Sequence, residues 1–323
     1  MKFTVFKNFI NKALVFYFPG LASYWHTITP CRINNTSKDE INYYLDFSSK
    51  FDFPGEFDQN GIPVYEHQSQ GKFYHPIVIC QYALGLFEIL QTSSPQNEKI
   101  RLNFIKQADW LVENGVTFKE KGLIWEINYN ISEYGLNRPW YSAMAQGEAM
   151  SVLMRAYHIS GNRNYVGAAE KALYPFNLEV SEGGLINYFK NFLIYEEYPS
   201  PLHTVGVLNG FMFSLFGLYD LNRFINDIRA GELFSEGVNS LKKLLPFYDI
   251  GSWSQYYLFD HPRTYPASFT YHMLVVEQLK ALAVISGEKV FSDYSEKWFG
   301  YSKNYLNRTR ALFQKLSYAR KLE

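Results

Sequence analysis

The stretch Ile77-Val78-Ile79-Cys80-Gln81-Tyr82-Ala83-Leu84-Gly85-Leu86-Phe87-Glu88, which follows Pro76, is apolar almost all round. Proline is favoured at the first helical position, so we expect a helix that begins at Pro76. A helix that is apolar on every side is buried by its neighbours. Residues 98–112 instead alternate between one apolar stripe and a charged face, which predicts a half-exposed partner helix.

The same hairpin of a buried inner helix and an amphipathic outer helix recurs along the chain. The inner helices are expected to start near Pro76, Trp140, Thr204 and Thr270, at steps of about 64 to 66 residues. A repeat of this length with two helices per unit predicts helices arranged in a ring or stack. We therefore expect an all-α fold, an incomplete (α/α) toroid of about four helical hairpins. The later hairpins are expected at 142–159 with 164–173, 206–224 with 231–244, and 269–286 with 289–315.

Short segments that follow glycines separate the hairpins. Residues 122–125, 184–187 and 251–254 resemble strands, and each comes before the next inner helix. The repeat predicts that these β segments lie in loops at one mouth of the toroid, where a cleft forms. Residues 1–65 show no strong helical period, so we expect an N-terminal arm that packs on a catalytic toroid domain of residues 66–323.

The composition excludes several classes of function. Lys and Arg number 31, as do Asp and Glu, so the chain lacks the excess basic charge of a nucleic-acid-binding protein. Cys31 and Cys80 fit neither a disulfide framework nor a metal site. Aromatic residues make up 18% of the chain, and tyrosines and tryptophans that lie in loops can line a sugar-binding cleft.

The N-terminus begins with Lys2, Lys7 and Lys12, followed by an apolar run over residues 13–18. Pro19-Gly20 interrupts this run too early for a membrane span. The segment is a poor signal peptide. We therefore expect a soluble protein, with the cytoplasm favoured over export.

Three strings in the inter-helix loops and inner helices are more specific than these patterns. They are Pro-Trp-Tyr-Ser-Ala-Met-Ala-Gln-Gly-Glu (139–148), Tyr-Glu-Glu-Tyr-Pro (195–199) and Val-Leu-Asn-Gly-Phe-Met-Phe-Ser-Leu-Phe-Gly-Leu-Tyr-Asp-Leu (207–221). Together they resemble the C-terminal domain of D-glucuronyl C5-epimerases over residues 70–300. That family inverts C5 of glucuronate within heparan-type polymers, so the resemblance implies an isomerase whose substrate is an acidic polysaccharide. Family resemblance also favours a homodimer, with the N-terminal arm and the last helix as candidate contacts.

The resemblance carries the family's site motifs onto particular positions. Its Glu-Tyr pair falls on Glu197 and Tyr198, its Tyr-Asp-Leu motif on Tyr256, and its Tyr-His motif on Tyr271 and His272. These assignments make Glu197, Tyr198, Tyr256 and Tyr271 the catalytic candidates.

The chain departs from the family at one motif. The family's Tyr-Asp-Leu-Arg-His is replaced by Tyr-Tyr-Leu-Phe-Asp-His at 256–261, so the expected arginine is missing at its own position. Arg263 is a candidate replacement, and the change leaves the identity of the substrate open.

The chemistry suits these residue types. A hydrogen next to a carboxylate is weakly acidic, so its removal needs a base together with hydrogen bonds or positive charge on the carboxylate. Inversion also needs an acid on the opposite face, and no metal or redox cofactor is required. We expect Glu197 and Tyr271 to form this acid/base pair, with Tyr198 and Tyr256 assisting. Either Arg138 or Arg263 is expected to hold the carboxylate. The remaining substrate-binding candidates are Trp140, Tyr141, Gln146, Asn209 and His272.

Other interpretations fit the same residues. A lyase would share the first proton abstraction and then expel the oxygen on C4. A toroid hydrolase needs two opposed carboxylates, and Glu126, Glu133 and Glu148 are candidate partners for Glu197. The altered motif at 256–261 also fits a sugar-binding protein whose catalytic site has decayed. Tyr198 and Tyr256 are alternatively loop-packing residues, and His272 a structural histidine.

Overall fold

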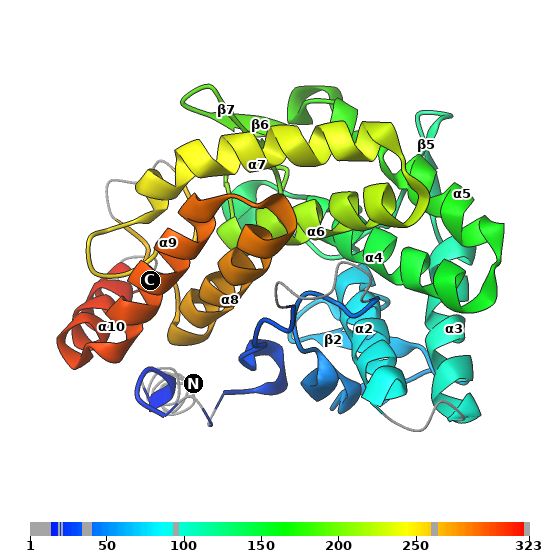
Figure 1. The fold of residues 1–323 in the computed structure, drawn as a ribbon, viewed down its shortest axis with the longest axis horizontal. Helices are drawn as coiled ribbons and strands as arrows, with labels where there is room; N and C mark the ends of the chain where they lie inside the picture. Colours follow the sequence, from blue (N-terminus) through cyan, green and yellow to red (C-terminus); the bar gives the residue numbers. More distant parts are fainter. Residues whose placement is uncertain are drawn as a thin grey trace.

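The computed structural model describes residues 14–18, 20, 22–33, 41–92, 97–259 and 264–319. These residues are mostly helical, with short antiparallel hairpins between the helices (Figure 1). None of the described helices is long and apolar enough to cross a bilayer. The helices are α2 (Pro76–Thr92), α3 (Glu98–Glu113), α4 (Ala143–Ser160), α5 (Arg163–Ala172), α6 (Leu208–Ile225), α7 (Ile228–Tyr248), α8 (Phe269–Ser286), α9 (Lys289–Lys303) and α10 (Tyr305–Ala319).

The helices alternate between an inner and an outer layer, as the sequence predicts. Helix α4 packs on α2 and α6, and α6 also packs on α8. Each of these inner helices also contacts the helix that follows it, α3, α5, α7 or α9. Figure 1 shows the four pairs following one another along an arc that is open between α8 and α2.

Helices α4 and α6 approach each other closely in the middle of this arc. A Cβ added to Gly147 would lie 2.6 Å from the Cα of Ser214, and one added to Gly217 would lie 2.5 Å from the Cα of Gly147. Real Cβ atoms do not approach other atoms this closely, so only glycine allows the two backbones to meet. This contact fixes the loops that precede α4 and α6 relative to each other.

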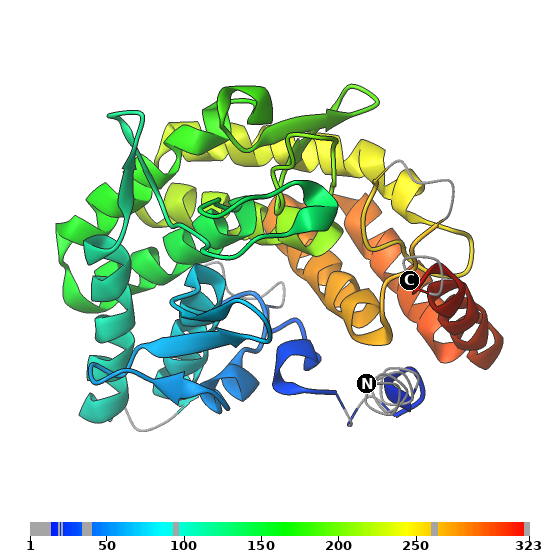
Figure 2. The same ribbon diagram turned by 180° about the vertical axis from the view of Figure 1, so that it is seen from behind.

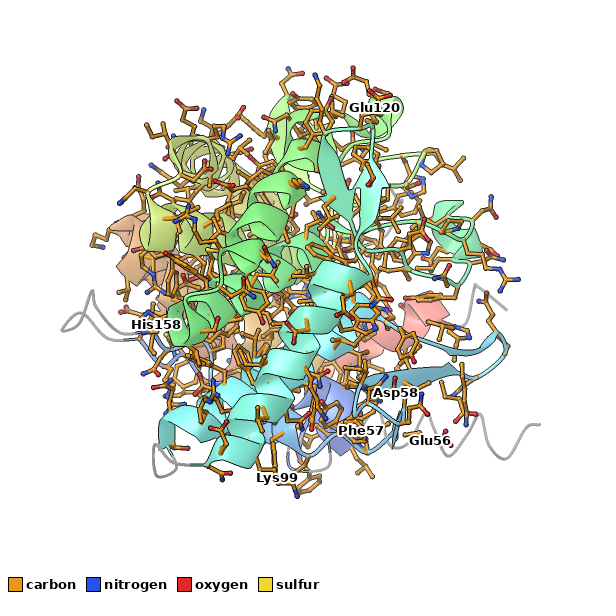
Figure 3. All side chains as sticks on the ribbon, turned by 90° about the vertical axis from the view of Figure 1, so that its right-hand side faces the viewer. Glu56, Phe57, Asp58, Lys99, Glu120 and His158 are labelled. Carbon is orange, nitrogen blue, oxygen red and sulfur yellow. The ribbon has the colours of Figure 1, made fainter. Side chains whose placement is uncertain are left out.

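Two of the three expected loop strands are present. Strand β5 (Gly122–Ile124) pairs with β4 (Val116–Phe118), and β6 (Ile186–Phe189) pairs with β7 (Phe192–Tyr195). Figure 3 shows Glu120 at the tip of the β4–β5 hairpin, at the opposite end of the molecule from Lys99. The prediction for residues 251–254 was wrong, because this segment forms bends with an isolated bridge from Ser254 to Asp249.

The prediction of a single helix over residues 289–315 is also wrong, because α9 ends at Lys303 and α10 starts at Tyr305. Asn304 adopts an extended backbone with ψ of 114°. Its side-chain oxygen accepts a hydrogen bond from the Leu306 amide at 2.9 Å. Asn304 therefore acts as the N-cap of a new helix. The pattern of apolar residues continues across Asn304, so the sequence does not reveal this break.

The N-terminal residues lie at the open side of the arc (Figure 2). The Cys31 amide donates to the carboxylate of Glu277 on α8 at 2.9 Å, and Arg32 forms an ion pair with Glu88 on α2. This segment therefore contacts both ends of the arc. Its further elements are the 3-10 helices η2 (Tyr24–His26) and η3 (Ser48–Phe51) and the sheet β1 (Glu56–Phe57), β2 (Pro63–His67) and β3 (Gly71–Phe73).

A buried ionic cluster fastens the same segment to the helices. Arg155 of α4 and Asp220 of α6 are fully buried and pair at 2.6 Å. Tyr44 donates to Asp220 at 2.5 Å, and Arg155 also donates to the Asn42 carbonyl at 2.9 Å. The cluster compensates the cost of burying both charges, and it joins the N-terminal residues to the two central inner helices.

Candidate active site

A cavity of about 380 Å³ opens where the N-terminal segment meets the inner helices. Its volume lies within the usual range for small-ligand pockets. Five of the residues expected at the site line it, and they come from two separate loops and two helix starts. They are Trp140, Glu197, Tyr198, Asn209 and Tyr271.

Glu197 lies in a bend that begins just after Glu196 and the end of β7. The carboxylate of Glu196 accepts the amides of Val205 and Gly206, both at 2.9 Å, which fixes this stretch against the next loop. The side chain of Glu197, unlike that of Glu196, lines the cavity. It is 5% exposed, and its Oε2 has no hydrogen-bond partner within the described residues.

The environment of Glu197 suits a base. Burial raises the pKa of its carboxyl to about 7, and a hydrogen bond from the Tyr198 hydroxyl opposes this rise. A carboxyl with a pKa near neutrality is both available and strong enough to remove a proton. The unpaired oxygen is the atom that would accept the proton.

Tyr271 lies in the first turn of α8, where its amide donates to Ser268, the N-cap of the helix, at 3.2 Å. Its ring packs against His26 and Tyr256, with centroid distances of 5.7 and 5.0 Å. Burial raises the pKa of Tyr271, the charge of Glu197 adds to the rise, and a hydrogen bond with Tyr256 opposes it. Tyr271 is therefore protonated at neutral pH and can donate a proton.

Four phenols surround the Glu197 carboxylate. Burial is the main cause of the raised pKa values of Tyr129, Tyr198, Tyr256 and Tyr271, and the charge of Glu197 raises all four further. Tyr256 does not line the cavity. Its ring packs behind that of Tyr271, which does. The site thus holds one carboxylate among protonated hydroxyl groups.

Aromatic packing holds these side chains in place. The ring of Tyr198 contacts those of Tyr134 and Trp140, at centroid distances of 4.9 and 5.7 Å. The indole of Trp140 also donates to the Tyr129 carbonyl at 2.7 Å. Tyr134 and Trp140 belong to a buried cluster beneath the loops that is separate from the main core.

Asn209 is the first-turn residue of α6 that faces the cavity. Its side chain is 3% exposed, and its Oδ1 has no partner among the described residues. Its backbone carbonyl accepts a hydrogen bond from Gln278 of α8 at 3.0 Å. The unpaired amide oxygen remains available to a ligand hydroxyl.

Several expected site residues lie elsewhere. Arg138 is exposed and does not line the cavity. Tyr141 packs edge-on against Phe118 at 5.3 Å, also outside the lining. Arg263 lies outside the described residues.

Gln146 and His272 make structural contacts. The buried amide of Gln146 donates to the Leu123 carbonyl at 2.8 Å and accepts from the Trp125 amide at 3.2 Å. His272 is buried, stacks on Trp253 at 3.8 Å, and contacts the Trp298 carbonyl at 2.9 Å through Nε2. Neither lines the cavity, and each uses its polar atoms to hold backbone or loop groups.

The sequence did not single out the part of the lining that comes from the N-terminal segment. Among these residues Lys50 is 4% exposed, and Trp25 is 41% exposed. No helical or strand period marks this region, so only the three-dimensional contacts reveal its role. The lining residues missed from this segment include Trp25, His26, Lys50, Tyr65 and His75. Gln81 of α2 and Tyr129 of the loop before α4 were missed as well.

No group of His, Cys, Asp and Glu side chains in the described part of the chain is arranged to hold a metal ion. The arrangement offers instead a base, several protonated phenols and one ammonium group around a cavity. Such a set can remove and return a proton on carbon.

Comparison with known proteins agrees with the motifs. The family model described as the D-glucuronyl C5-epimerase C-terminus matches residues 119–300. A D-glucuronyl C5-epimerase of Caenorhabditis elegans is 38% identical over 236 residues, which are 68% of this chain and 38% of that protein. An uncharacterized protein of Methanocaldococcus jannaschii is 30% identical over 197 residues, which are 60% of this chain and 61% of that protein. The match therefore spans less than two thirds of each relative's length.

Proposed function

Since the chain belongs to the D-glucuronyl C5-epimerase C-terminal family, we propose that it inverts C5 of D-glucuronate residues in a polysaccharide to give L-iduronate. The observation that carries this proposal is that Glu197 and Tyr271 line the same cavity. One is a buried carboxyl with a pKa of about 7 and a free oxygen. The other is a phenol that remains protonated.

In the proposed reaction Glu197 removes the proton from C5. The electrons of the broken C–H bond move into the adjacent carboxylate, which becomes an enediolate. Tyr271 then gives its hydroxyl proton to C5 from the opposite face, and the electrons return to form the new C–H bond. Exchange of protons with water restores the Glu197 carboxylate and the Tyr271 hydroxyl, so the net reaction changes only the configuration of C5.

Tyr198 and Tyr256 support this pair in the proposal. Tyr198 donates a hydrogen bond to Glu197 and limits the rise of its pKa. Tyr256 forms a hydrogen bond with Tyr271, which would stabilise the phenolate formed when Tyr271 loses its proton. Asn209 and Trp140 are proposed to bind the sugar ring, through an amide oxygen and an indole face.

We also propose that the arc of hairpins is an incomplete (α/α) toroid with the cavity at its mouth. The regular succession of contacts between α2, α4, α6 and α8 supports this description. The N-terminal residues then occupy the position where a closed ring would have further helices.

Incubation in heavy water with a glucuronate-containing polymer tests the function. We expect deuterium at C5 and the appearance of iduronate signals in the NMR spectrum. A lyase would instead produce an unsaturated uronate that absorbs in the ultraviolet, together with shorter chains. Absence of C5 exchange across non-sulfated and N-sulfated polymers would contradict the proposal.

A further inference from the structure

Lys50 brings a cation from the N-terminal segment to the wall of the cavity. It lies in η3, is 4% exposed, and lines the same cavity as Glu197 and Tyr271. Within the described lining it is the only side chain with an ammonium or guanidinium group. Position alone therefore makes it a candidate partner for an anionic ligand.

The ammonium group is only partly satisfied by the protein. It donates to the Tyr24 carbonyl at 2.7 Å, whereas an ammonium has three hydrogens to donate. No carboxylate lies within ion-pair distance of it in the parts of the chain that the structure describes. Glu148 influences Lys50 only at longer range.

Burying a charged group without a counter-charge costs free energy. An anion that binds beside the Lys50 ammonium would offset this cost. Burial lowers the pKa of Lys50 to about 8, which still leaves the group mostly protonated at neutral pH. A carboxylate that entered the cavity would supply the missing charge and acceptors.

We propose that Lys50 binds the carboxylate of the uronate whose C5 lies between Glu197 and Tyr271. The inference rests on the proposed function and adds to it the group that holds the reacting acid. Negative charge moves onto the carboxylate as the C5 proton leaves, so an ammonium there stabilises the transition state more than the ground state. Arg138, the described arginine that was expected in this role, is exposed and outside the lining.

The assignment gives the N-terminal segment a catalytic task. The inner helices would supply Tyr271 and Asn209, the loop after β7 would supply Glu197, and η3 would supply the cation. The contacts of Cys31 with Glu277 and of Arg32 with Glu88 then fix the cation relative to the acid/base pair.

The test compares binding of an acidic oligosaccharide with binding of its carboxyl-reduced form. The probes are a hexasaccharide of alternating glucuronate and N-acetylglucosamine, and the same compound with each carboxylate reduced to an alcohol. Calorimetric titration should show that the wild-type protein prefers the acid by at least about 10-fold, as expected for a charge-assisted hydrogen bond. Lys50→Gln and Lys50→Met should both lose this preference.

Two features keep the test decisive. Lys50→Gln retains a hydrogen-bond donor for the Tyr24 carbonyl, so it should fold even if Lys50→Met does not. Lys289→Met removes a lysine that is 84% exposed and remote from the lining, and it should leave the preference unchanged. A folded Lys50→Gln protein that still prefers the acid, or a wild-type protein with no preference, would overturn the proposal.

The binding test and the exchange test separate the two proposals. C5 exchange by the wild type together with an unchanged preference in Lys50→Gln would retain the epimerase function and reject the role of Lys50. A preference that depends on Lys50 without C5 exchange would retain the carboxylate site and reject the epimerase function.

Discussion

Gly210 of α6 leaves the space that the side chain of Glu197 occupies. A Cβ at position 210 would lie 2.6 Å from the Cβ of Glu197 and 2.9 Å from its carboxyl carbon. Gly210, the third residue of α6, thus makes room for the loop that carries Glu197. The position of the proposed base therefore depends on the absence of one methyl group.

Gly210→Ala should displace Glu197 and reduce C5 exchange by about 100-fold, because small displacements of a reacting group cost this much. Overpacking should also lower the free energy of unfolding by about 1–3 kcal/mol. Exchange rates from NMR and denaturant unfolding measure the two effects.

Gly167→Ala is the matched control. Gly167 lies in α5 and has no atom within 4 Å of an added Cβ. Alanine should raise the free energy of unfolding by up to about 1 kcal/mol through its higher helix propensity, and C5 exchange should not change. A Gly210→Ala protein with wild-type exchange would show that the tight contact has no bearing on activity.

Tyr271→Phe removes a hydroxyl and retains the ring that packs on His26 and Tyr256. Inversion of C5 should fall by at least about 100-fold, because the opposite face loses its proton donor. The yield of iduronate measures this loss. Tyr188→Phe, at a tyrosine that is 44% exposed on β6, should have no effect; equal losses in both variants would contradict the assigned role of Tyr271.

The rate of C5 exchange should rise with pH through about 7, the pKa of Glu197. The proposed base acts only when ionised, so the rate should be low at pH 5 and rise toward pH 7. Above about pH 8 the rate should fall again if the Lys50 ammonium is also required, because that group then loses its proton. The raised pKa of Tyr271 keeps the acid protonated over this range. Initial rates at a series of pH values measure the profile, and a rate that declines from pH 5 to pH 8 would exclude Glu197 as the base.

The same pKa shift affects stability with a defined sign. The folded-state pKa of Glu197 lies above its ordinary value of 4.5, so its contribution to stability is present below about pH 4.5 and is lost as the pH rises through 7. The stability of Glu197→Gln relative to that of the wild type should therefore be greater at pH 8 than at pH 4. Denaturant titrations at both values test this, and an advantage that is larger at pH 4 would contradict it.

His272→Phe should destabilise the fold by about 1–3 kcal/mol at pH 7, because the Trp298 carbonyl loses its donor. Burial lowers the pKa of His272 from 6.5 to about 3. Its contribution to stability is therefore present above about pH 6.5 and is lost as the pH falls toward 3. The difference in unfolding free energy between the two proteins should shrink from pH 7 to pH 4; a growing difference would show that the folded protein holds a charged imidazole.

The helices were the most predictable part of the structure, for a physical reason. Inner helices such as α2 and α4 are buried on nearly all sides, so their apolar composition and capping residues mark them clearly in the sequence. The break at Asn304 was missed because the apolar period continues from α9 into α10. The segment at 251–254 resembles a strand but gains only isolated bridges.

The placement of candidate residues around one cavity was predictable where they follow one another in a motif. Glu197 and Tyr198 share one loop, and Tyr271 begins an inner helix, so the repeat brings them to one mouth. Gln146 and His272 were expected at the site because they lie within or next to motif strings, although such strings also contain residues that hold backbone groups. Lys50 could not be predicted, because long-range contacts of a segment without periodicity bring it to the cavity.

The most direct test of the account is a crystal structure of the Glu197→Gln protein with a glucuronate-containing oligosaccharide in the cavity. We expect the side chains of residues 197 and 271 to lie within about 3.5 Å of C5 on opposite faces of one sugar ring. A ring with both side chains on the same face, or a uronate bound with its C5 remote from either of them, would contradict it.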